Sequence, residues 1–484
     1  MSSSFFIKNK ENHKKGKSPA VSKRKVSYVT DGDSGAKSIK RAKKANPKHN
    51  EEISSDSETE SSAVPKKRQP SEEIEYEETP QEKKLRLAKL YLEQLKEEEE
   101  KRAEEESFES DLIAGRLQEE VLEQKGKLQR FIAKDLIAPD ASEIRVLRGH
   151  KLPVTCLVIT PDDKCIFSAA KDCSIVKWDV ESGKKLHTIP GGRKGTEDRH
   201  VGHTAHILCM AMSSDGKYLA TGDMNKLIMI WEAETCKHLY KFTGHKGPVS
   251  GLSFRKGTHD LYSASHDRSV KVWNVDENAY VETLFGHQDA ITGLDSLSRE
   301  RCVTAGGRDR TVRVWKIAEE SQLVFYGHEG SIDCIQLINE EHMITGADDG
   351  SVCLWSVNKK KPLSTVKQAH GCHGDAGLEQ PHWVASVAAL QNSDTVASGA
   401  SGSHNSQVQL WKCSQNYRGL EPLFSVPVSG FVNSLKFSSS GQFLVAGVGQ
   451  EHRLGRWWRL KDAKNGIYII PLKRKPPTQE EVND

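Results

Sequence analysis

The feature that most constrains this chain is a repeat in which a Gly-His pair is followed, at an almost fixed distance, by a tryptophan. The histidine-to-tryptophan distance is 28 residues in four copies and 27 in a fifth, and a sixth copy, His370 to Trp411, is longer. Repeats of about 40–45 residues with Gly-His and Trp-Asp signatures are typical of the four-stranded blades of a β-propeller. The regular copies are Gly149-His150 to Trp178, Gly202-His203 to Trp231, Gly244-His245 to Trp273, Gly286-His287 to Trp315 and Gly327-His328 to Trp355.

A seventh, degenerate copy follows the sixth and brings the expected blade count to seven. Each copy holds short runs of β-branched and aromatic residues between turn residues, which is the pattern of strands in an all-β domain. We therefore expect a seven-bladed WD-repeat β-propeller over residues 143–473. The expected strands of the seventh blade are 432–437, 443–447 and 455–460.

Closing such a ring requires a strand from outside the last repeat. Residues 144–148 lie directly ahead of the first Gly-His pair, but residues 467–471 near the C-terminus compete for the same position. If both segments form strands, we expect one of them to become an added edge strand, whose exposed side Pro471 and Lys473 would protect.

The rest of the chain divides by charge and composition. Residues 1–50 carry 14 Lys/Arg against 3 acids, and residues 51–111 carry 21 Asp/Glu against 10 Lys/Arg. A basic segment followed by an acidic one is typical of interaction tails, because too few apolar residues are present to offset the entropy lost on folding. We expect a disordered tail over residues 1–79 and a second one over residues 474–484.

Two kinds of signal lie within the N-terminal tail. Clusters of basic residues resemble nuclear import signals, although nucleic-acid contacts and a merely solubilising tail are alternatives. Three serines with acids downstream match the preference of an acid-directed kinase. The basic residues are Lys23, Arg24, Lys25, Lys40, Arg41, Lys43 and Lys44, and the serines are Ser54, Ser55 and Ser57.

Residues 80–138 show a helical pattern instead. Pro80 suits a helix start, and leucines from Leu85 to Leu95 recur at i, i+3 and i+4 spacing among Lys and Glu, with a second apolar stripe after residue 111. An amphipathic stripe of this length is expected to pack against the propeller, another helix or a partner protein. The number of leucines favours a partner over a free, charged helix.

Several function classes lack a signature. The ten cysteines form no Cys-x-x-Cys pair and lie mostly in apolar runs, which indicates free thiols in a reducing compartment.

No apolar stretch is long enough to span a membrane, and residues 5–7 are flanked by lysines, so we expect an intracellular, soluble protein. The spacing His200-x-x-His203-x-x-His206 lacks the Cys or paired carboxylates of a metal site, and no cofactor motif is present.

A Ser/Thr, His, Asp and Trp set recurs within the blades and resembles a catalytic triad. Because a catalytic site is built once and this set is repeated, we interpret it as a structural hydrogen-bond network and expect no enzymatic activity. Asn225 and Asn405 stand where Asp is expected in blades two and six, and Ala305 replaces the hydroxyl residue in blade four. The complete sets are His150, Ser168, Asp172 and Trp178; His245, Ser263, Asp267 and Trp273; and His328, Thr345, Asp349 and Trp355.

Residues beside the network Asp are expected to project from one face of the ring. Blades one, three and four present a basic arc there, which suits a phosphate backbone, with ordinary surface charge as an equal alternative. Residues 452–459 interleave cations with Trp457 and Trp458, a mix that suits base stacking, and one indole is expected to fill the usual Trp position of the blade. The candidate RNA contacts are Lys171, His266, Arg268, Arg308, Arg310, Arg453, Arg456 and Arg459.

Three stretches resemble one known family. Residues 81–95, residues 144–150 and the run 437–458, which contains Gly-Gln-Glu-His-Arg-Leu-Gly-Arg-Trp-Trp, are similar to the U3 small nucleolar RNA-interacting WD-repeat proteins. The resemblance implies a subunit of the box C/D ribonucleoprotein that guides early cleavages of pre-ribosomal RNA, among other proteins of the small-subunit processome of the nucleolus. It also implies recognition of the box B/C element of U3 RNA together with a kink-turn-binding box C/D core protein.

Two classes of function remain. The preferred one is a non-catalytic RNA-binding scaffold of the U3 ribonucleoprotein in the nucleus and nucleolus, without a cofactor, a small-molecule substrate or a membrane partner. The alternative is a protein-only WD-repeat adaptor, such as a ubiquitin-ligase substrate receptor or a chromatin reader. A steep fall of RNA affinity with salt would separate the two.

Overall fold

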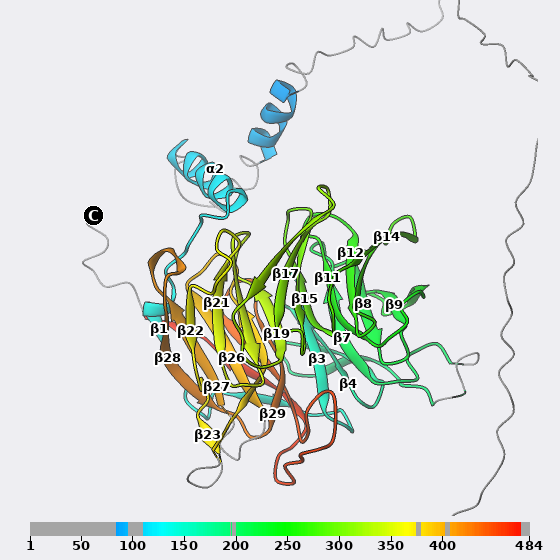
Figure 1. The fold of residues 1–484 in the computed structure, drawn as a ribbon. Coiled ribbons are helices and arrows are strands. Elements are labelled where there is room, and N and C mark those ends of the chain that lie inside the picture. The colour runs from blue at the N-terminus through cyan, green and yellow to red at the C-terminus, as the bar shows by residue number, and fades with distance from the viewer. Residues whose placement is uncertain are drawn as a thin grey trace, which may run out of the picture. The chain divides into compact units, whose positions relative to one another are not determined.

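The ring predicted from the repeats is present. The predicted seven-bladed propeller is confirmed, because seven four-stranded antiparallel sheets follow one another around a central axis (Figure 1). The basic clusters and serines of the tail lie outside the described residues, as does Asn405. The computed structural model describes residues 84–94, 110–193, 195, 200–373, 379–401 and 407–475.

The first three blades each take four consecutive strands. Their first strands line the central channel, and their fourth strands lie at the periphery. Blade 1 consists of β3 (Val154–Ile159), β4 (Cys165–Ala170), β5 (Ile175–Asp179) and β6 (Lys185–Ile189); blade 2 of β7 (Ile207–Met212), β8 (Tyr218–Asp223), β9 (Ile228–Glu232) and β10 (His238–Phe242); blade 3 of β11 (Val249–Phe254), β12 (Asp260–Ser265), β13 (Ser269–Asn274) and β14 (Ala279–Phe285).

Blades 4 to 6 repeat this order. A two-stranded hairpin, β23 (Cys372–His373) with β24 (Gln380–Pro381), lies in the link between blades 5 and 6. Blade 4 consists of β15 (Ile291–Ser296), β16 (Arg301–Gly306), β17 (Thr311–Lys316) and β18 (Ser321–Tyr326); blade 5 of β19 (Ile332–Leu337), β20 (His342–Ala347), β21 (Val352–Ser356) and β22 (Ser364–Val366); blade 6 of β25 (Trp383–Ala389), β26 (Thr395–Ser401), β27 (Gln407–Cys413) and β28 (Leu420–Pro427).

Blade 7 joins the two ends of the propeller. Its order is β29 (Phe431–Phe437), β30 (Phe443–Gly449), β31 (Gly466–Pro471) and β2 (Arg145–Leu147), so the N-terminal segment supplies the outer strand. Both closing segments belong to the sheet, with β31 third and β2 at its edge, so the expectation that one of two such strands becomes the edge strand is confirmed. The expected protection of that edge by Pro471 is wrong, because Pro471 lies in β31 and pairs with Phe443 of β30.

The expected strand 455–460 of blade 7 is also wrong. These residues belong to a long connection between β30 and β31, in which Glu451 and Arg459 form an isolated antiparallel bridge. Leu444 pairs with Ile470, whereas the equivalent Leu261 of blade 3 pairs with Trp273. Ile470 thus occupies the position that the tryptophan takes in the other blades, and neither indole of the connection is needed for the blade.

The hydrophobic core lies between neighbouring blades. One cluster joins Trp178 and Ile166 of blade 1 to Val445 and Ile469 of blade 7, and another joins blades 4 and 5 around Trp355. The first strands of successive blades contact one another around the whole ring, including β29 with β3. Because burial of each large apolar side chain contributes about 1.5–3 kcal/mol, this packing of blade on blade stabilises the closed circle.

Helices precede the propeller. Residues 84–94 are helical, and α2 (Ser110–Gln124) leads into a segment, residues 125–137, that we call the strap. The strap lies against the turns that join the first and second strands of the blades: Arg130 pairs with Ser393, and buried Leu128 and Ala133 anchor it. It includes the short helix η1 (Ala133–Asp135) and β1 (Leu136–Ile137), which pairs with β32 (Lys473–Arg474); η2 (Gln415–Tyr417) lies in blade 6.

The leucines of helix 84–94 remain exposed in the described structure. Leu85, Leu87, Leu90 and Leu92 present their side chains to solvent, while Tyr91 donates a hydrogen bond to Glu120 of α2. The expected docking of this apolar stripe on a partner protein stays a prediction.

Candidate nucleic-acid interface

One end of the propeller gathers the turns between second and third strands and the links that enter each next blade. In an antiparallel four-stranded blade these connections share one end, and the other two turns share the opposite end. The network residues Asp172, Asp267, Asp309 and Asp349 all lie in these turns. We call this end the Asp-turn face.

A hydrogen-bond network fixes the Asp-turn face in blades 1 to 6. In blade 3 the Trp273 indole N–H donates to Ser263 Oγ at 2.8 Å, and Ser263 lies 2.8 Å from His245 Nε2. The other ring nitrogen, His245 Nδ1, lies 3.0 Å from the Asp267 carboxylate. Although burial opposes it, the hydrogen bonds from His245 and Ser269 hold the pKa of Asp267 well below its usual range, so the carboxylate is charged.

The same tryptophan–hydroxyl–histidine chain is present in blades 1 to 6. The sequence analysis expected Asn225 in blade 2 and Ala305 in blade 4 to replace network residues, and both expectations are wrong. Blade 2 keeps a carboxylate, because Asp223 lies 2.9 Å from His203 Nδ1, and blade 4 keeps a hydroxyl, because Thr304 lies 2.7 Å from His287 Nε2.

The carboxylate contacts differ between blades 1 and 5. His150 Nδ1 lies 3.1 Å from Ser174 Oγ and 3.6 Å from Asp172, so the serine takes part of the role of the carboxylate. In blade 5 His328 Nδ1 lies 2.9 Å from Ser351 Oγ, and Asp349 instead accepts a hydrogen bond from the Gly330 N–H. The repeated network is therefore a structural device with variable details, which fits no single catalytic centre.

Three of the candidate arginines are exposed on the Asp-turn face. Arg268 and Arg310 directly follow the network carboxylates of blades 3 and 4, and both have positive φ angles, of 71° and 55°. Arg308 precedes Asp309 in the same turn of blade 4, and its backbone N–H donates to Asp289. Arg310 also donates from its guanidinium to the Glu329 carbonyl at 3.1 Å. These side chains form a basic arc on two neighbouring blades.

Two other candidates do not add to this arc. Lys171 is only 5% exposed, and its ammonium donates to the Gly455 carbonyl and lies 3.6 Å from Glu451, so the expected projection of Lys171 is wrong. His266 is half-buried, and burial together with the neighbouring Arg453 lowers its pKa. It is therefore neutral at physiological pH.

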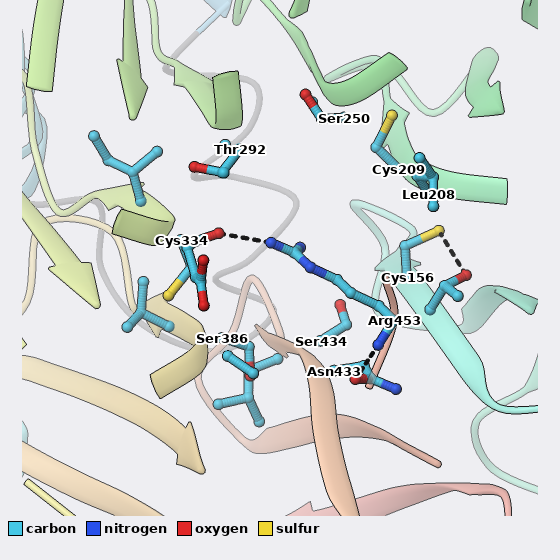
Figure 2. A pocket seen from close by; sticks show the side chains of 18 of the residues that line it. Cys156, Leu208, Cys209, Ser250, Thr292, Cys334, Ser386, Asn433, Ser434 and Arg453 are labelled. Atoms are coloured by element: carbon cyan, nitrogen blue, oxygen red, sulfur yellow. Dashed lines mark hydrogen bonds between the residues drawn. The ribbon is translucent and has the colours of Figure 1, made fainter. Parts of the chain in front are cut away.

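Arg453 closes the central channel instead of projecting from the surface. The channel holds a cavity of about 110 Å³ lined by the first strands of all seven blades, and Figure 2 shows Arg453 extended across it. Its guanidinium donates to the Asp333 carbonyl at 2.6 Å, and its backbone N–H donates to the Asn433 side chain at 3.0 Å. The loop of blade 7 is thus attached to blade 5 across the axis of the ring.

The remaining candidates, Arg456 and Arg459, lie at the surface of the blade-7 connection. Arg456 Nε lies 3.1 Å from the buried Glu451 carboxylate, and the Arg459 guanidinium donates to Gln450 Oε1 at 2.9 Å. The structure therefore separates the eight candidates into an arc on blades 3 and 4, an exposed pair on blade 7, and three residues that are buried or plug the channel.

Sequence reasoning missed Trp383, which starts β25 and so lies on the Asp-turn face beside the blade-7 connection. Its indole lies 6.1 Å from that of Trp457, measured between ring centroids. Trp383 lies outside the His-to-Trp repeat, and this alone could have marked it in the sequence as a candidate functional residue.

The described residues show no other kind of centre. Among them, no cluster of three or more His, Cys, Asp and Glu side chains could hold a metal ion. His200, His203 and His206 do not converge: His200 contacts the Pro190 carbonyl, His203 belongs to the blade network, and His206 contacts the Lys171 carbonyl. No helix in the described part of the chain has the length and apolar character that a bilayer crossing requires.

The fold and its repeated network define the class. The family model "WD domain, G-beta repeat" matches residues 141–179, 196–232, 236–274, 278–316 and 319–356, so the protein is a WD-repeat propeller. U3 small nucleolar RNA-interacting protein 2 of Mus musculus is 65% identical over 461 residues, which cover 95% of each chain. The chain belongs to the family of this protein.

Two further comparisons agree. A solved structure described as "Structure of U3-55K" is 68% identical, with a TM-score of 0.67, and covers 69% of this chain and all of its own. Ribosomal RNA-processing protein 9 of Saccharomyces cerevisiae is 29% identical over 455 residues, which cover 74% of this chain and 79% of that protein.

Proposed function

We propose that this protein is a non-catalytic, RNA-binding scaffold subunit of the U3 small nucleolar ribonucleoprotein. It acts in early pre-ribosomal RNA processing for the small ribosomal subunit. The observation that carries the proposal is the 65% identity, along 95% of both chains, to a protein whose name states interaction with U3 small nucleolar RNA. The name of the Saccharomyces cerevisiae relative adds ribosomal RNA processing.

The finer parts of the proposal concern partners and location. The RNA element is box B/C of U3, and the protein binds it beside a kink-turn-binding box C/D core protein and other small-subunit processome proteins in the nucleolus. The basic clusters from Lys23 to Lys44 serve nuclear import, and Ser54, Ser55 and Ser57 are sites of phosphorylation. Phosphate groups there would add negative charge to an already acidic segment.

The absence of catalysis is proposed from the blade network. A hydroxyl, a histidine and a carboxylate recur in blade after blade, with the hydroxyl engaged by a buried indole N–H. A serine held this way accepts one hydrogen bond and donates another, so its Oγ is committed to structure and unavailable as a nucleophile.

The proposed RNA contacts are the exposed arginines of the Asp-turn face. Arg268, Arg308 and Arg310 place three guanidinium groups on two adjacent turns. The network carboxylates Asp267 and Asp309 fix the backbone of these turns by accepting hydrogen bonds from the N–H groups of Ser269 and Thr311. Guanidinium groups suit phosphate oxygens because they donate two parallel hydrogen bonds and keep their charge at any physiological pH. The arc therefore supplies affinity for a backbone and leaves base recognition to other residues.

Two charge-reversal variants of the full chain test this proposal. The first is R268E/R308E/R310E on the Asp-turn face. The control, K184E/K237E/K359E, reverses three exposed lysines in turns at the opposite end, with the same change in net charge. Affinity for a U3 fragment containing box B/C, with the kink-turn-binding protein already bound, is measured at several salt concentrations.

We expect the arginine variant to bind at least about tenfold more weakly and to lose about three units from the slope of log affinity against log salt. The lysine variant keeps most of its affinity. Equal losses in both variants would overturn the arc as the contact surface. No RNA protection by the wild-type chain, even beside the kink-turn-binding protein, would favour the protein-only adaptor instead.

A further inference from the structure

The central channel has a second mouth, at the end of the ring opposite the Asp-turn face. Two cavities, of about 450 and 320 Å³, lie there and share the side chains of Lys256, Gln336, Lys436 and Phe437. We call these two cavities the mouth chamber. The smaller one is lined by residues of all seven blades. Volumes of this size are typical of ligand pockets, which span about 300–1,000 Å³.

Lys436 places a positive charge inside the mouth chamber. It lies on β29, the first strand of blade 7, and is partly buried. Its ammonium donates a hydrogen bond to Gln336 Oε1 at 2.8 Å, and Gln336 Nε2 donates to the Asp295 carboxylate at 2.7 Å. Among the described residues, Gln336 is the one acceptor for this ammonium. Because an ammonium carries three N–H donors, Lys436 can also bind an acid supplied by a ligand.

The second cation of the chamber, Lys256, is paired with an acid from the helical arm. Its ammonium lies 2.9 Å from Glu123 Oε1 of α2, although the two residues are 133 positions apart. The two side chains are 49% and 38% exposed. An exposed ion pair of this kind shifts an equilibrium by no more than about fivefold, because water competes for both charges. A stronger acidic ligand can therefore displace Glu123.

The end of α2 brings Glu123 to the chamber. Gly126 has a φ angle of 68°, a left-handed conformation that ends the helix, and the Lys127 N–H donates to the Leu122 carbonyl at 2.9 Å. A Cβ atom at Gly126 would lie 3.0 Å from Glu341 Cγ, so the chain turns closely over blade 5 before it continues into the strap. Glu123, in the last turn before this glycine, lines the larger cavity.

Apolar walls stand beside the two ammonium groups. Pro161 and Phe437 line both cavities, and Ile159 and Met212 line the smaller one. The segment of α2 that reaches the chamber reads Val-Leu-Glu over residues 121–123, and its two apolar side chains are exposed. A nucleic acid matches such a site poorly, because its backbone is bound by many clustered cations and its bases by open aromatic faces. An acidic peptide with apolar neighbours matches both the charge and the walls.

We propose that the mouth chamber binds an acidic, apolar-flanked peptide segment of a partner protein, whose carboxylate contacts Lys436 and Lys256. Glu123 occupies part of this site until the partner displaces it. The site goes beyond the proposed function, because it lies at the other end of the ring from the arginines of blades 3 and 4. The propeller can therefore hold RNA on one face and a protein on the other.

Fluorescence anisotropy of a labelled peptide tests the site directly. The probe carries residues 113–126 of this chain, and a second peptide differs from it only by Glu123→Gln. Both are titrated with the full-length wild type and with full-length E123Q, in which the resident carboxylate is removed. K436Q, K256Q and a control, K359Q, are then introduced into the E123Q chain. Lys359 is exposed in the turn between β21 and β22, at the same end of the ring but outside the chamber.

We expect E123Q to bind the probe about two- to fivefold more tightly than the wild type, because the competing carboxylate is gone. Adding K436Q weakens binding about 10- to 150-fold, the range for loss of a hydrogen bond to a charged group. Adding K256Q weakens it about two- to fivefold, and adding K359Q leaves it unchanged. The Glu123→Gln peptide binds more weakly than the probe. Thermal melting verifies that each variant is folded.

Each remaining outcome counts against the proposal. No binding of the probe by E123Q, or equal binding by the K436Q and K359Q chains, would overturn the chamber as a peptide site. Equal affinity for the two peptides would contradict the role of the carboxylate. Displacement of the probe by a 12-nucleotide oligouridine would make the chamber a nucleic-acid site instead.

The proposed function is tested separately on the same chains. We expect K436Q to bind the U3 fragment as the wild type does, because Lys436 lies away from the Asp-turn face. Failure of the peptide titration would therefore leave the RNA scaffold standing. Absence of U3 binding by the wild type, with the peptide results as expected, would remove the proposed function and leave the mouth chamber as a protein-binding site.

Discussion

At the scale of single residues, one hydroxyl in each of blades 1 to 6 serves two buried partners at once. In blade 4 the Trp315 indole N–H donates to Thr304 Oγ1 at 2.8 Å, and the same oxygen lies 2.7 Å from His287 Nε2. All three groups are buried. Removal of the hydroxyl would leave an indole N–H and a ring nitrogen without partners, and each such loss costs about 1–3 kcal/mol.

We therefore expect Thr304→Val, which preserves shape, to lower the free energy of unfolding by about 2–5 kcal/mol. Chemical denaturation with tryptophan fluorescence measures the change. Thr235→Val, at an exposed turn of blade 2, is the control and changes stability by less than about 0.5 kcal/mol. A valine at position 304 as stable as the wild type would mean that the network contributes no stability.

Counting residues along the sequence placed Ala305, and not Thr304, at the hydroxyl position of blade 4. In most blades the hydroxyl lies ten residues before the tryptophan, and ten residues before Trp315 is Ala305. The turn of blade 4 is one residue longer, so β16 presents Thr304 instead. In blade 2 the carboxylate likewise comes from Asp223, at the end of β8, and not from the position of Asn225. Only the strand register reveals such one- and two-residue shifts.

At the scale of elements, the strap joins the helical arm to the propeller. Its backbone N–H groups at Ile132 and Ala133 both donate to Asp394 Oδ1, at 2.8 and 3.0 Å, and Arg130 exchanges backbone hydrogen bonds with Asn392 and Asp394. Asp394 is fully buried. A single carboxylate therefore fixes the direction in which the arm leaves blade 6.

Asp394→Ala is expected to release the strap without opening the ring. The amides of Arg130, Ile132 and Ala133 lose their acceptors or their fixed position, so their hydrogen exchange accelerates at least about tenfold. Exchange in β11 to β13, on blade 3, stays as in the wild type. Asp140→Ala, at an exposed position beside the strap, is the control and leaves all of these rates unchanged. Unaltered protection in D394A would contradict the assigned role.

The elements most accessible to sequence reasoning were those that repeat. Six blades follow from the distance between His and Trp, because that distance reflects three strands and two turns of fixed length. In blade 7 the expected strands 432–437 and 443–447 are confirmed as β29 and β30, but the third strand could not be placed, because the connection between β30 and β31 is long and Ile470 replaces the tryptophan. The exposed indoles beside the channel could be predicted only in part: the sequence marks Trp457 and Trp458, but only folding brings Trp383 next to Trp457.

At the scale of the whole molecule, buried histidines link stability to pH. Burial lowers the pKa of His328 and of His370 from 6.5 to about 4. The unfolded chain therefore takes up these protons first as the pH falls. The stabilisation is fully present above about pH 6.5 and is lost progressively towards pH 4. Asp333 acts in the opposite sense, because burial raises the pKa of its carboxyl to about 7.

His370 gives the cleanest test of this linkage. Its Nε2 lies 2.9 Å from Ser398 Oγ, and its buried Nδ1 has no hydrogen-bond partner among the described residues, so the protonated ring would have one N–H group without an acceptor among those residues. Between pH 7 and pH 5 this residue should cost the wild type about 2 kcal/mol of unfolding free energy. His370→Gln lowers the free energy of unfolding at both pH values. It also removes the contribution of His370 to the pH dependence, so the difference between the unfolding free energies at pH 7 and pH 5 is about 2 kcal/mol smaller than in the wild type. His187→Gln, at an exposed strand position, keeps the wild-type gap. An unchanged gap in H370Q would show that the ring nitrogen finds an acceptor when it is protonated.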